Sequence, residues 1–221
     1  MRKLLFAFTI LSCIAGRAQV VINELDSDTP STDDLEFVEL KSATPNFPLN
    51  GYVLVFFNGT GTNATKSYYA ISLSGLTTDV NGIAVVGNTL VSPVPDRVFS
   101  NSIIQNGPDG IGLYLGSLSD FPMNTTATTS NLVDALVHDT SDADATALMA
   151  LLGVSAQIDE NANGLGSTQS IQRKSDGTYE IKPPTPGANN DGSGFIYNGV
   201  KINVAANTYN EGDSFNITFT T

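Results

Sequence analysis

The stretch VINELDSDTPSTDDLEFVEL, residues 21–40, contains two apolar segments with an acidic loop between them. Seven of the 22 acidic residues lie within it: Glu24, Asp26, Asp28, Asp33, Asp34, Glu36 and Glu39. The flanking segments 20–25 and 35–40 are rich in residues that favour strands, and turn-forming residues lie between them. The stretch therefore predicts a β-hairpin.

Three roles are open to these acids. Asp26, Asp28, Asp33 and Asp34 could supply oxygen ligands to calcium, which takes about six to eight of them. Alternatively, the aspartates are solvated in the turn and the glutamates lie on outward strand faces, with one of them partly buried and hydrogen-bonded. The loose spacing favours this second interpretation. Paired-carboxylate hydrolysis is disfavoured, because nothing nearby marks a sugar cleft.

The first 18 residues have the pattern of a secretory signal peptide. A basic start is followed by the apolar run LLFAFTILSCIAG, and small residues at Gly16 and Ala18 precede a cut before Gln19. Removal of residues 1–18 also removes Cys13, the only cysteine, so that the mature chain has no disulfide and no thiol nucleophile. The sequence thus predicts a secreted protein, extracellular or at the cell surface.

The charge of the mature chain is strongly negative. Seven basic residues remain against 22 acidic residues, which gives a net charge of −15. Such a chain repels the phosphate backbone, so direct nucleic-acid binding is not expected. No second long apolar run follows the signal peptide, so no membrane span is predicted.

Short apolar runs recur between turn signals along the rest of the chain. Further strands are expected at 52–59, 67–75, 82–88, 110–116, 131–139 and 167–175. The run 52–59 is almost continuously apolar, which is typical of a strand buried on both faces. At least eight short strands predict an all-β fold, a sandwich or barrel.

One helix interrupts the strands, in the segment 141–154. Ser141 or Asp142 could cap it, and Asp144 would place negative charge in its first turn. An apolar face is expected from Ala147, Leu148, Leu151 and Leu152, and Gly153 would end the helix. We expect this helix to cover an open end or edge of the sandwich.

Two domains are expected in the mature chain. The proline cluster at 183–186 and the Gly, Asn and Asp residues after it indicate the end of a strand and a linker. The last segment, SFNITFTT (214–221), alternates again. We therefore expect one domain over 19–190, followed over 191–221 by a linker and the start of a second, truncated β-domain.

Three stretches together resemble the lamin tail domain family, as it occurs in secreted bacterial proteins. They are VINEL with EFVEL (21–40), LNGYVLVFF (49–57) and STQSIQRKSDGTYEIKPPTPGANN (167–190). NGPDGIGLYLG and NLVDALVHD lie between them where the family has two more strands. The family commonly has tryptophan where this chain has Tyr52. The resemblance implies an immunoglobulin-like β-sandwich, here with one short inserted helix.

The resemblance also implies a binding or tethering module and no catalytic residues. The expected partner is an extracellular protein or a polysaccharide. Two alternatives remain: an accessory domain of a secreted hydrolase, such as a nuclease or phosphatase, whose catalytic part lies outside this sequence, and a calcium-dependent adhesion module.

A few other residues are candidates for chemistry. Asp159, Asn161 and Asn163 match the first half of an EF-hand loop, but Ser170 stands where that loop needs glutamate, which favours an Asx-rich turn. His138, the only histidine, is expected at the surface or at a sheet edge, and catalysis by it is disfavoured. Arg173 is expected to pair with a carboxylate of the acidic opening, although a grip on an acidic ligand is the alternative for Arg173 and Lys174.

Overall fold

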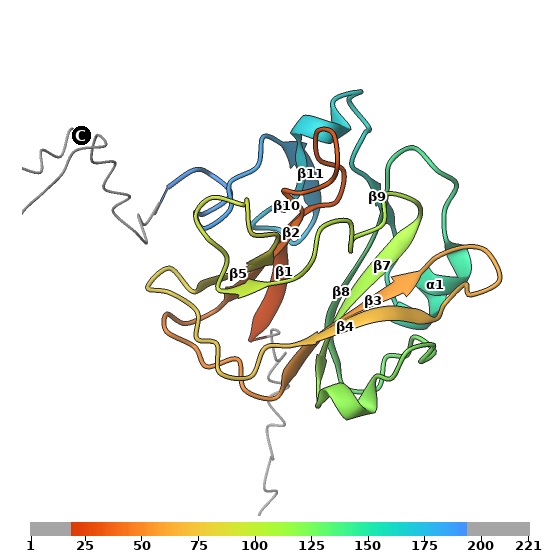
Figure 1. The fold of residues 1–221 in the computed structure, drawn as a ribbon, viewed down its shortest axis with the longest axis horizontal. Helices are drawn as coiled ribbons and strands as arrows, with labels where there is room; N and C mark the ends of the chain where they lie inside the picture. The colour runs from red at the N-terminus through yellow and green to blue at the C-terminus, as the bar shows by residue number, and fades with distance from the viewer. Residues whose placement is uncertain (1–18, 194–221) are drawn as a thin grey trace, which may run out of the picture.

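A computed structural model of the chain describes residues 19–193, which form a sandwich of two β-sheets (Figure 1). The larger sheet has the strand order β11-β10-β1-β2-β5-β6 and the smaller sheet β4-β3-β7-β8-β9. The strands of the larger sheet are β1 (Val20–Asp26), β2 (Phe37–Ser42), β5 (Ile83–Gly87), β6 (Arg97–Val98), β10 (Ser170–Arg173) and β11 (Tyr179–Lys182). Those of the smaller sheet are β3 (Tyr52–Asn58), β4 (Ser67–Ser72), β7 (Asp109–Leu115), β8 (Leu132–Asp139) and β9 (Gln157–Asp159). The predicted all-β class with one short helix is confirmed.

The acidic opening forms the predicted hairpin. Strands β1 and β2 pair antiparallel, with Ile22 opposite Leu40 and Leu25 opposite Val38. All four side chains are fully buried in the core between the sheets. The register shifts between Ile22 and Glu24, so that Asn23 is an extra residue in β1, as in a β-bulge.

Strand β3 is buried on both faces, as its apolar run predicts. Leu54 and Phe56 point into the core between the two sheets. Val53, Val55 and Phe57 belong to a second apolar cluster on the outer face of the smaller sheet. That outer face is therefore apolar, and other parts of the chain must shield it from water.

Helix α1 (Thr146–Leu152) is part of this cover, and it ends at the predicted Gly153, which is left-handed at φ 69°. Its buried side chains are Leu148 and Leu152, which pack against the outer cluster. The close approach depends on Gly110 of β7, where an added Cβ would lie 2.9 Å from Leu148 Cδ2. The helix thus covers a sheet face, and the expectation that it covers an end or edge is wrong.

The predicted start and apolar face of α1 also need correction. The helix begins after Ala145, so neither Ser141 nor Asp142 caps it and no acid lies in its first turn. The Asp142 amide donates to the Asp139 carboxylate at 2.5 Å, which holds the preceding residues in a turn. Leu151 is 38% exposed and Ala147 is exposed as well. Ala145, which directly precedes the helix, is buried in the outer cluster with Leu148 and Leu152.

Residues 183–190, here called the closing segment, follow β11 and lie against the outer face of the larger sheet. Gly187 and Ala188 are buried in this segment. The linker is predicted over 191–221, and the chain before it stays packed up to Asn190 because amides and hydroxyls of the closing segment bond to groups on β1 and β2. The predicted signal peptide and nearly all of the predicted second domain lie outside the described residues. No helix within 19–193 is long and apolar enough to cross a membrane.

Candidate functional site

The two glutamates opposite each other on β1 and β2 fasten the closing segment. Glu24 and Glu39 alternate with core residues, so they lie on the outer face of the larger sheet, and both are fully buried. Glu24 accepts hydrogen bonds from the Thr185 amide and hydroxyl, each at 2.8 Å, and from Ser170 Oγ at 2.6 Å. Glu39 accepts from the Gly187 amide at 2.8 Å.

Burial raises the pKa of both carboxyls. For Glu24 the loss of solvent outweighs the hydrogen bonds from Ser170 and Thr185, so that its pKa is raised. For Glu39 burial and then the nearby charge of Glu24 raise the pKa well above its usual range. All four carboxylate oxygens accept a hydrogen bond, which gives the pair a structural role as the anchor of the closing segment.

Glu36 has a similar role at the other end of the hairpin. It is buried and accepts hydrogen bonds from the amides of Ile103 and Ile104, at 3.0 and 3.1 Å. Burial raises the pKa of Glu36 to about 7. The prediction of a buried, hydrogen-bonded glutamate is therefore confirmed, and it holds for Glu24, Glu36 and Glu39 alike.

The four calcium candidates of the opening do not share one environment. Asp33 and Asp34 are half-buried and accept hydrogen bonds within the turn, from the Thr29 amide and the Thr32 hydroxyl. Asp28 accepts from Asn106 Nδ2 at 3.2 Å. Asp26 is 6% exposed, and its Oδ1 atom has no hydrogen-bond partner among residues 19–193.

The weaker calcium candidates form the expected Asx-rich turn. Asp159 Oδ1 accepts from the Asn161 amide, Asn161 Oδ1 from the Gly166 amide and Asn163 Oδ1 from the Leu165 amide. Within residues 19–193, no group of three or more acidic, histidine or cysteine side chains is placed to hold a metal ion. Calcium binding by either loop stays a prediction.

A residue that the sequence did not single out joins these two loops. Glu160 is fully buried and accepts hydrogen bonds from the amides of Ser27 and Asp28 and from the Ser27 hydroxyl. Burial raises the pKa of Glu160 to about 8, and the charge of Asp28 also raises it. Nothing in the local pattern distinguishes this glutamate from an exposed loop residue.

His138 is fully buried, so its predicted place at the surface or at an edge is wrong. It lies within β8, between Asp109 on β7 and Ile158 on β9, because β9 adds a parallel strand outside β8. Neither ring nitrogen has a hydrogen-bond partner in the described part of the chain. Burial lowers the pKa of His138 to about 4, which keeps the ring neutral.

Arg173 pairs with Asp134 on β8, and the predicted pairing with the acidic opening is wrong. Its Nη1 atom lies 2.9 Å from Asp134 Oδ2 and 2.8 Å from the Tyr179 hydroxyl. Arg173 is two residues from the core residue Ile171, so both point toward the smaller sheet, where Asp134 lies. Glu24 and Glu39 lie on the opposite face.

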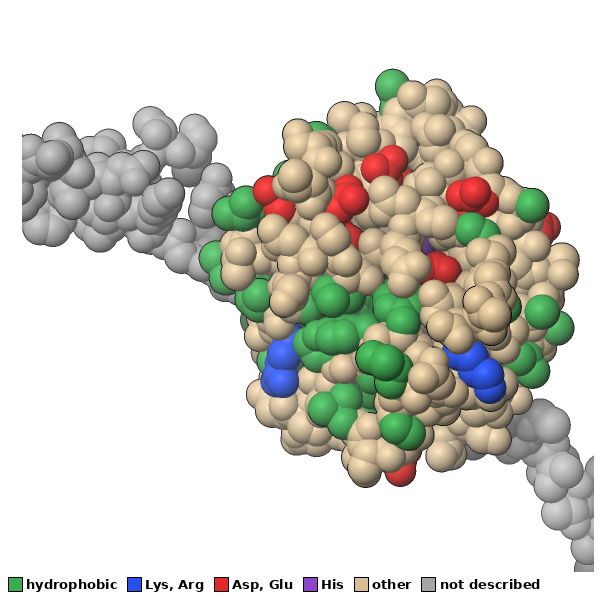
Figure 2. Space-filling view, turned by 45° about the vertical axis from the view of Figure 1, so that its right-hand side comes forward, with side chains coloured by type: hydrophobic (Ala, Val, Ile, Leu, Met, Phe, Trp, Pro, Cys, Tyr) green, Lys and Arg blue, Asp and Glu red, His purple; other side chains and the backbone are tan. Residues whose placement is uncertain are grey.

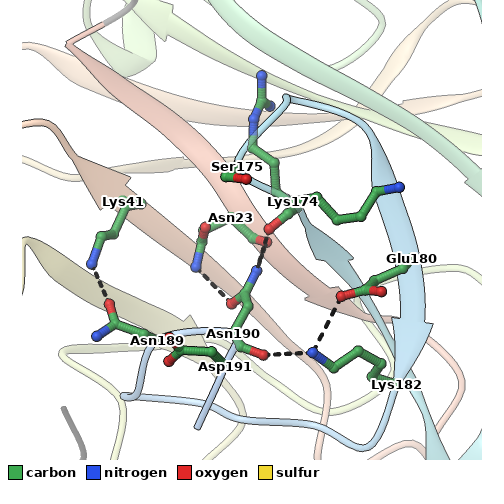
Figure 3. A pocket seen from close by; sticks show the side chains of 10 residues that line it. Asn23, Lys41, Lys174, Ser175, Glu180, Lys182, Asn189, Asn190 and Asp191 are labelled. Carbon is green, nitrogen blue, oxygen red and sulfur yellow. Dashed lines mark hydrogen bonds and ion pairs between the residues drawn. The ribbon is translucent and has the colours of Figure 1, made fainter. Parts of the chain in front are cut away.

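Most basic residues of the described chain surround one hollow on the outer side of the larger sheet (Figure 3). The hollow has a volume of about 560 Å³, and its lining includes Lys41, Lys174 and Lys182, three of the four lysines between residues 19 and 193. The lining also includes Arg173 and the acids Glu180 and Asp191. We call this hollow the basic groove.

Amide side chains form the floor of the basic groove. Asn23 Nδ2 donates to Asn190 Oδ1 at 2.8 Å, and Asn190 Nδ2 donates back to the Asn23 carbonyl at 3.0 Å. Asn190 also bonds to the Arg173 carbonyl at 2.8 Å. The bulge residue of β1 and the last residue of the closing segment therefore lock together, and the fold itself shapes the groove.

The lysines of the groove are held to different degrees. Lys41 donates to Asn189 Oδ1 and to the Asn81 carbonyl, each at 2.6 Å, and Lys182 donates to Glu180 at 3.2 Å and to the Asn190 carbonyl at 2.7 Å. The Lys174 side chain is exposed and makes no hydrogen bond or ion pair with the described residues. Lys41 also forms no ion pair within this part of the chain.

The face drawn in Figure 2 differs from the basic groove. On the face drawn in Figure 2, acidic side chains are spread over the upper half, and basic side chains are few.

Comparison of the chain with family models, with curated proteins and with solved structures found no match. The resemblance to the lamin tail domain family therefore stays a prediction from the sequence.

Proposed function

We propose that residues 19–190 form a non-catalytic, extracellular binding module of lamin-tail type within a larger secreted protein, and that the ligand binds in the basic groove. The observation that carries this proposal is the gathering of three of four lysines around one amide-lined hollow. Surface lysines of an acidic chain would otherwise be scattered among the acids. The non-catalytic part of the proposal is supported by Glu24 and Glu39, because their oxygens already bond to the closing segment.

Binding to immobilised extracellular polymers tests this proposal. The panel contains acidic polysaccharides, a neutral polysaccharide and a matrix protein such as gelatin, and retention of the purified protein is measured. A variant with Lys41, Lys174 and Lys182 changed to Gln should lose retention, whereas the Lys66→Gln variant should keep it. Lys66 is a matched control because it is the one described lysine outside the groove. Equal retention of all three proteins, or none by the wild type, would contradict the proposal.

Two other functions predicted from the sequence have their own tests. An accessory role beside a hydrolase requires a catalytic domain encoded beyond Thr221, which the gene sequence decides. Calcium-dependent adhesion requires that calcium bind the folded protein, so the thermal midpoint should rise with calcium in excess over chelator. An unchanged midpoint would remove the calcium-dependent function.

A further inference from the structure

We infer that the ligand of the basic groove is an acidic polysaccharide, a polymer of sugars that carry carboxylate or sulfate groups. This inference rests on the proposed binding function and names the chemical class of its ligand. Charge, shape and the chemical mix of the lining each contribute to it.

The local charge of the groove opposes that of the domain around it. Residues 19–193 contain six basic and 20 acidic residues, but four basic and two acidic residues line the groove, and the Arg173 guanidinium among them points toward Asp134 of the smaller sheet. Arg173 is engaged with Asp134 and Lys182 with Glu180, which leaves Lys41 and Lys174 without an acidic partner within ion-pair distance among the described residues. The exposed Lys174 ammonium is therefore open to a negative group of a ligand, and the half-buried Lys41 ammonium, held by two neutral oxygens, keeps one further donor for such a group.

The shape fits an extended ligand better than a single small anion. The lysines come from β2, from the turn after β10 and from β11, and Figure 3 shows Lys41 across the floor from Lys174 and Lys182. A second hollow of about 670 Å³ shares Lys41, Arg173, Lys174 and Ser175 with the groove and so extends it, and its lining adds two acids, Asp134 and Asp176, of which Asp134 is paired with Arg173. A polymer with negative groups at intervals can reach lysines on both sides at once.

The lining suits sugar hydroxyls. A hydroxyl both donates and accepts hydrogen bonds. The groove offers Asn189 Nδ2, which donates once within the described chain, as a donor and the oxygens of Glu180 and Asp191 as acceptors. No aromatic side chain lines either hollow. Single-stranded nucleic acids bind mainly by stacking bases on aromatic side chains within a positive channel, and this surface lacks the stacking platform.

Binding of four probes tests the ligand class: polygalacturonate for carboxylates, dextran sulfate for sulfates, dextran as the neutral polymer and a single-stranded DNA oligonucleotide. We expect the protein to bind polygalacturonate, dextran sulfate or both, and to bind neither dextran nor the oligonucleotide. Affinity should fall as salt rises, because exposed charge pairs are screened. The Lys174→Gln variant should bind about fivefold more weakly, in the range for one exposed ion pair, and Lys66→Gln should bind like the wild type.

The outcomes that overturn the inference are distinct from those that overturn the proposed function. Dextran bound as tightly as the acidic polymers, with loss in the groove variants, would exclude the acidic class and leave the groove as a binding site. Preferred binding of the oligonucleotide would replace the polysaccharide with nucleic acid. Failure of all four probes would overturn the inference, and retention of the protein on gelatin would then leave the proposed binding function in place. Because the Lys174 side chain is exposed and makes no hydrogen bond in the described chain, its variant should fold like the wild type, which the thermal midpoint checks.

Discussion

The carboxyl of Asp26, at the end of β1, is one whose ionisation the fold strongly opposes. It is 6% exposed, and its Oδ1 atom has no hydrogen-bond partner among the described residues. Burial, followed by the charges of Glu160, Glu24, Asp28 and Glu36, raises the pKa of Asp26 to about 10. These four charges are all negative, so each of them opposes ionisation of Asp26.

The raised pKa of Asp26 predicts a pH dependence of stability. A group whose pKa is higher in the folded state stabilises the fold below its unfolded pKa, and that contribution is lost as pH rises toward the folded pKa. Glu36 and Glu160, with pKa values of about 7 and about 8, act in the same direction. The free energy of unfolding in urea should therefore be larger at pH 5 than at pH 8.

The Asp26→Asn variant isolates the contribution of this carboxyl. At pH 8 it should be more stable than the wild type by about 1–3 kcal/mol, the usual range for an unsatisfied buried polar group. The difference should shrink at pH 5. Asp34→Asn, in the half-buried turn, is the control and should change stability little at either pH. A less stable Asp26→Asn protein at pH 8 would show that the carboxylate is needed in its charged form.

For single residues, the sequence indicates that a glutamate is buried and hydrogen-bonded better than it indicates which residue bonds to which. A glutamate flanked by apolar residues on both strand faces must be partly buried, so the hydrogen-bonded Glu24 and Glu39 could be expected. The partner of Arg173 could not, because Asp134 lies in the other sheet and 39 residues away. Glu160 gave no signal either, since its burial depends on the loop of residues 27–28 that lies over it.

Among the elements, helix α1 is important because it covers the outer face of the smaller sheet. Leu148 is fully buried there, so Leu148→Ala should lower the free energy of unfolding by about 2–4 kcal/mol. Leu151 on the same helix is 38% exposed, and Leu151→Ala should cost clearly less. Urea unfolding of the two variants compares them directly, and equal losses would contradict the placement of the helix.

The closing segment is held by hydrogen bonds rather than by strand pairing. Thr185→Val keeps the size of the side chain but removes the hydroxyl that donates to Glu24 Oε2 at 2.8 Å. We expect a loss of about 1–2 kcal/mol, because the buried carboxylate oxygen is left without this donor. The Gly187 amide should also exchange its hydrogen faster. Thr60→Val, at an exposed turn, is the control; unchanged exchange at Gly187 would contradict the anchoring role.

Strands were predicted from sequence more reliably than the elements that cover them. Alternating apolar residues indicate a strand with one buried face, and the continuous apolar run at 52–59 indicates a strand with two. Both patterns can be recognised within a short stretch of sequence. The start of α1 depends on tertiary contacts: Asp139 holds the turn before it, and Gln157 accepts from the Ala145 amide at 2.8 Å. The proline cluster of the closing segment has the composition of a linker, and hydrogen bonds from distant parts of the chain, among them those of Glu24, Glu39 and Asn23, keep it in place.

Across the whole molecule, the basic groove exists only because the fold is complete. Lys41 and Lys174 are 133 positions apart in the chain, so sequence patterns gave no sign that they line one hollow. The floor of the groove likewise joins Asn23 to Asn190, from opposite ends of the described chain. A site assembled from both ends of a domain cannot be recognised as a motif.

Removal of the closing segment should destabilise the entire domain, although no strand is lost. In a chain that ends at Lys182, Glu24 and Glu39 would lose Thr185 and Gly187 and would lie uncovered beside each other on paired strands. Ionisation would then set two like charges opposite each other, which destabilises a sheet. We expect a much lower thermal midpoint, measured by circular dichroism, than for a chain that ends at Ser193. Equal midpoints would show that the segment is dispensable.

The position of β1 between β10 and β2 also governs the order in which the chain can fold. Synthesis delivers β1 and β2 first, but the neighbour of β1 on its other side is made about 145 residues later. Contacts between such distant segments carry a large loop-closure cost and make folding slow. A nascent chain of this protein therefore cannot complete its larger sheet until residues 170–190 have emerged, although every strand of the smaller sheet has been made by then.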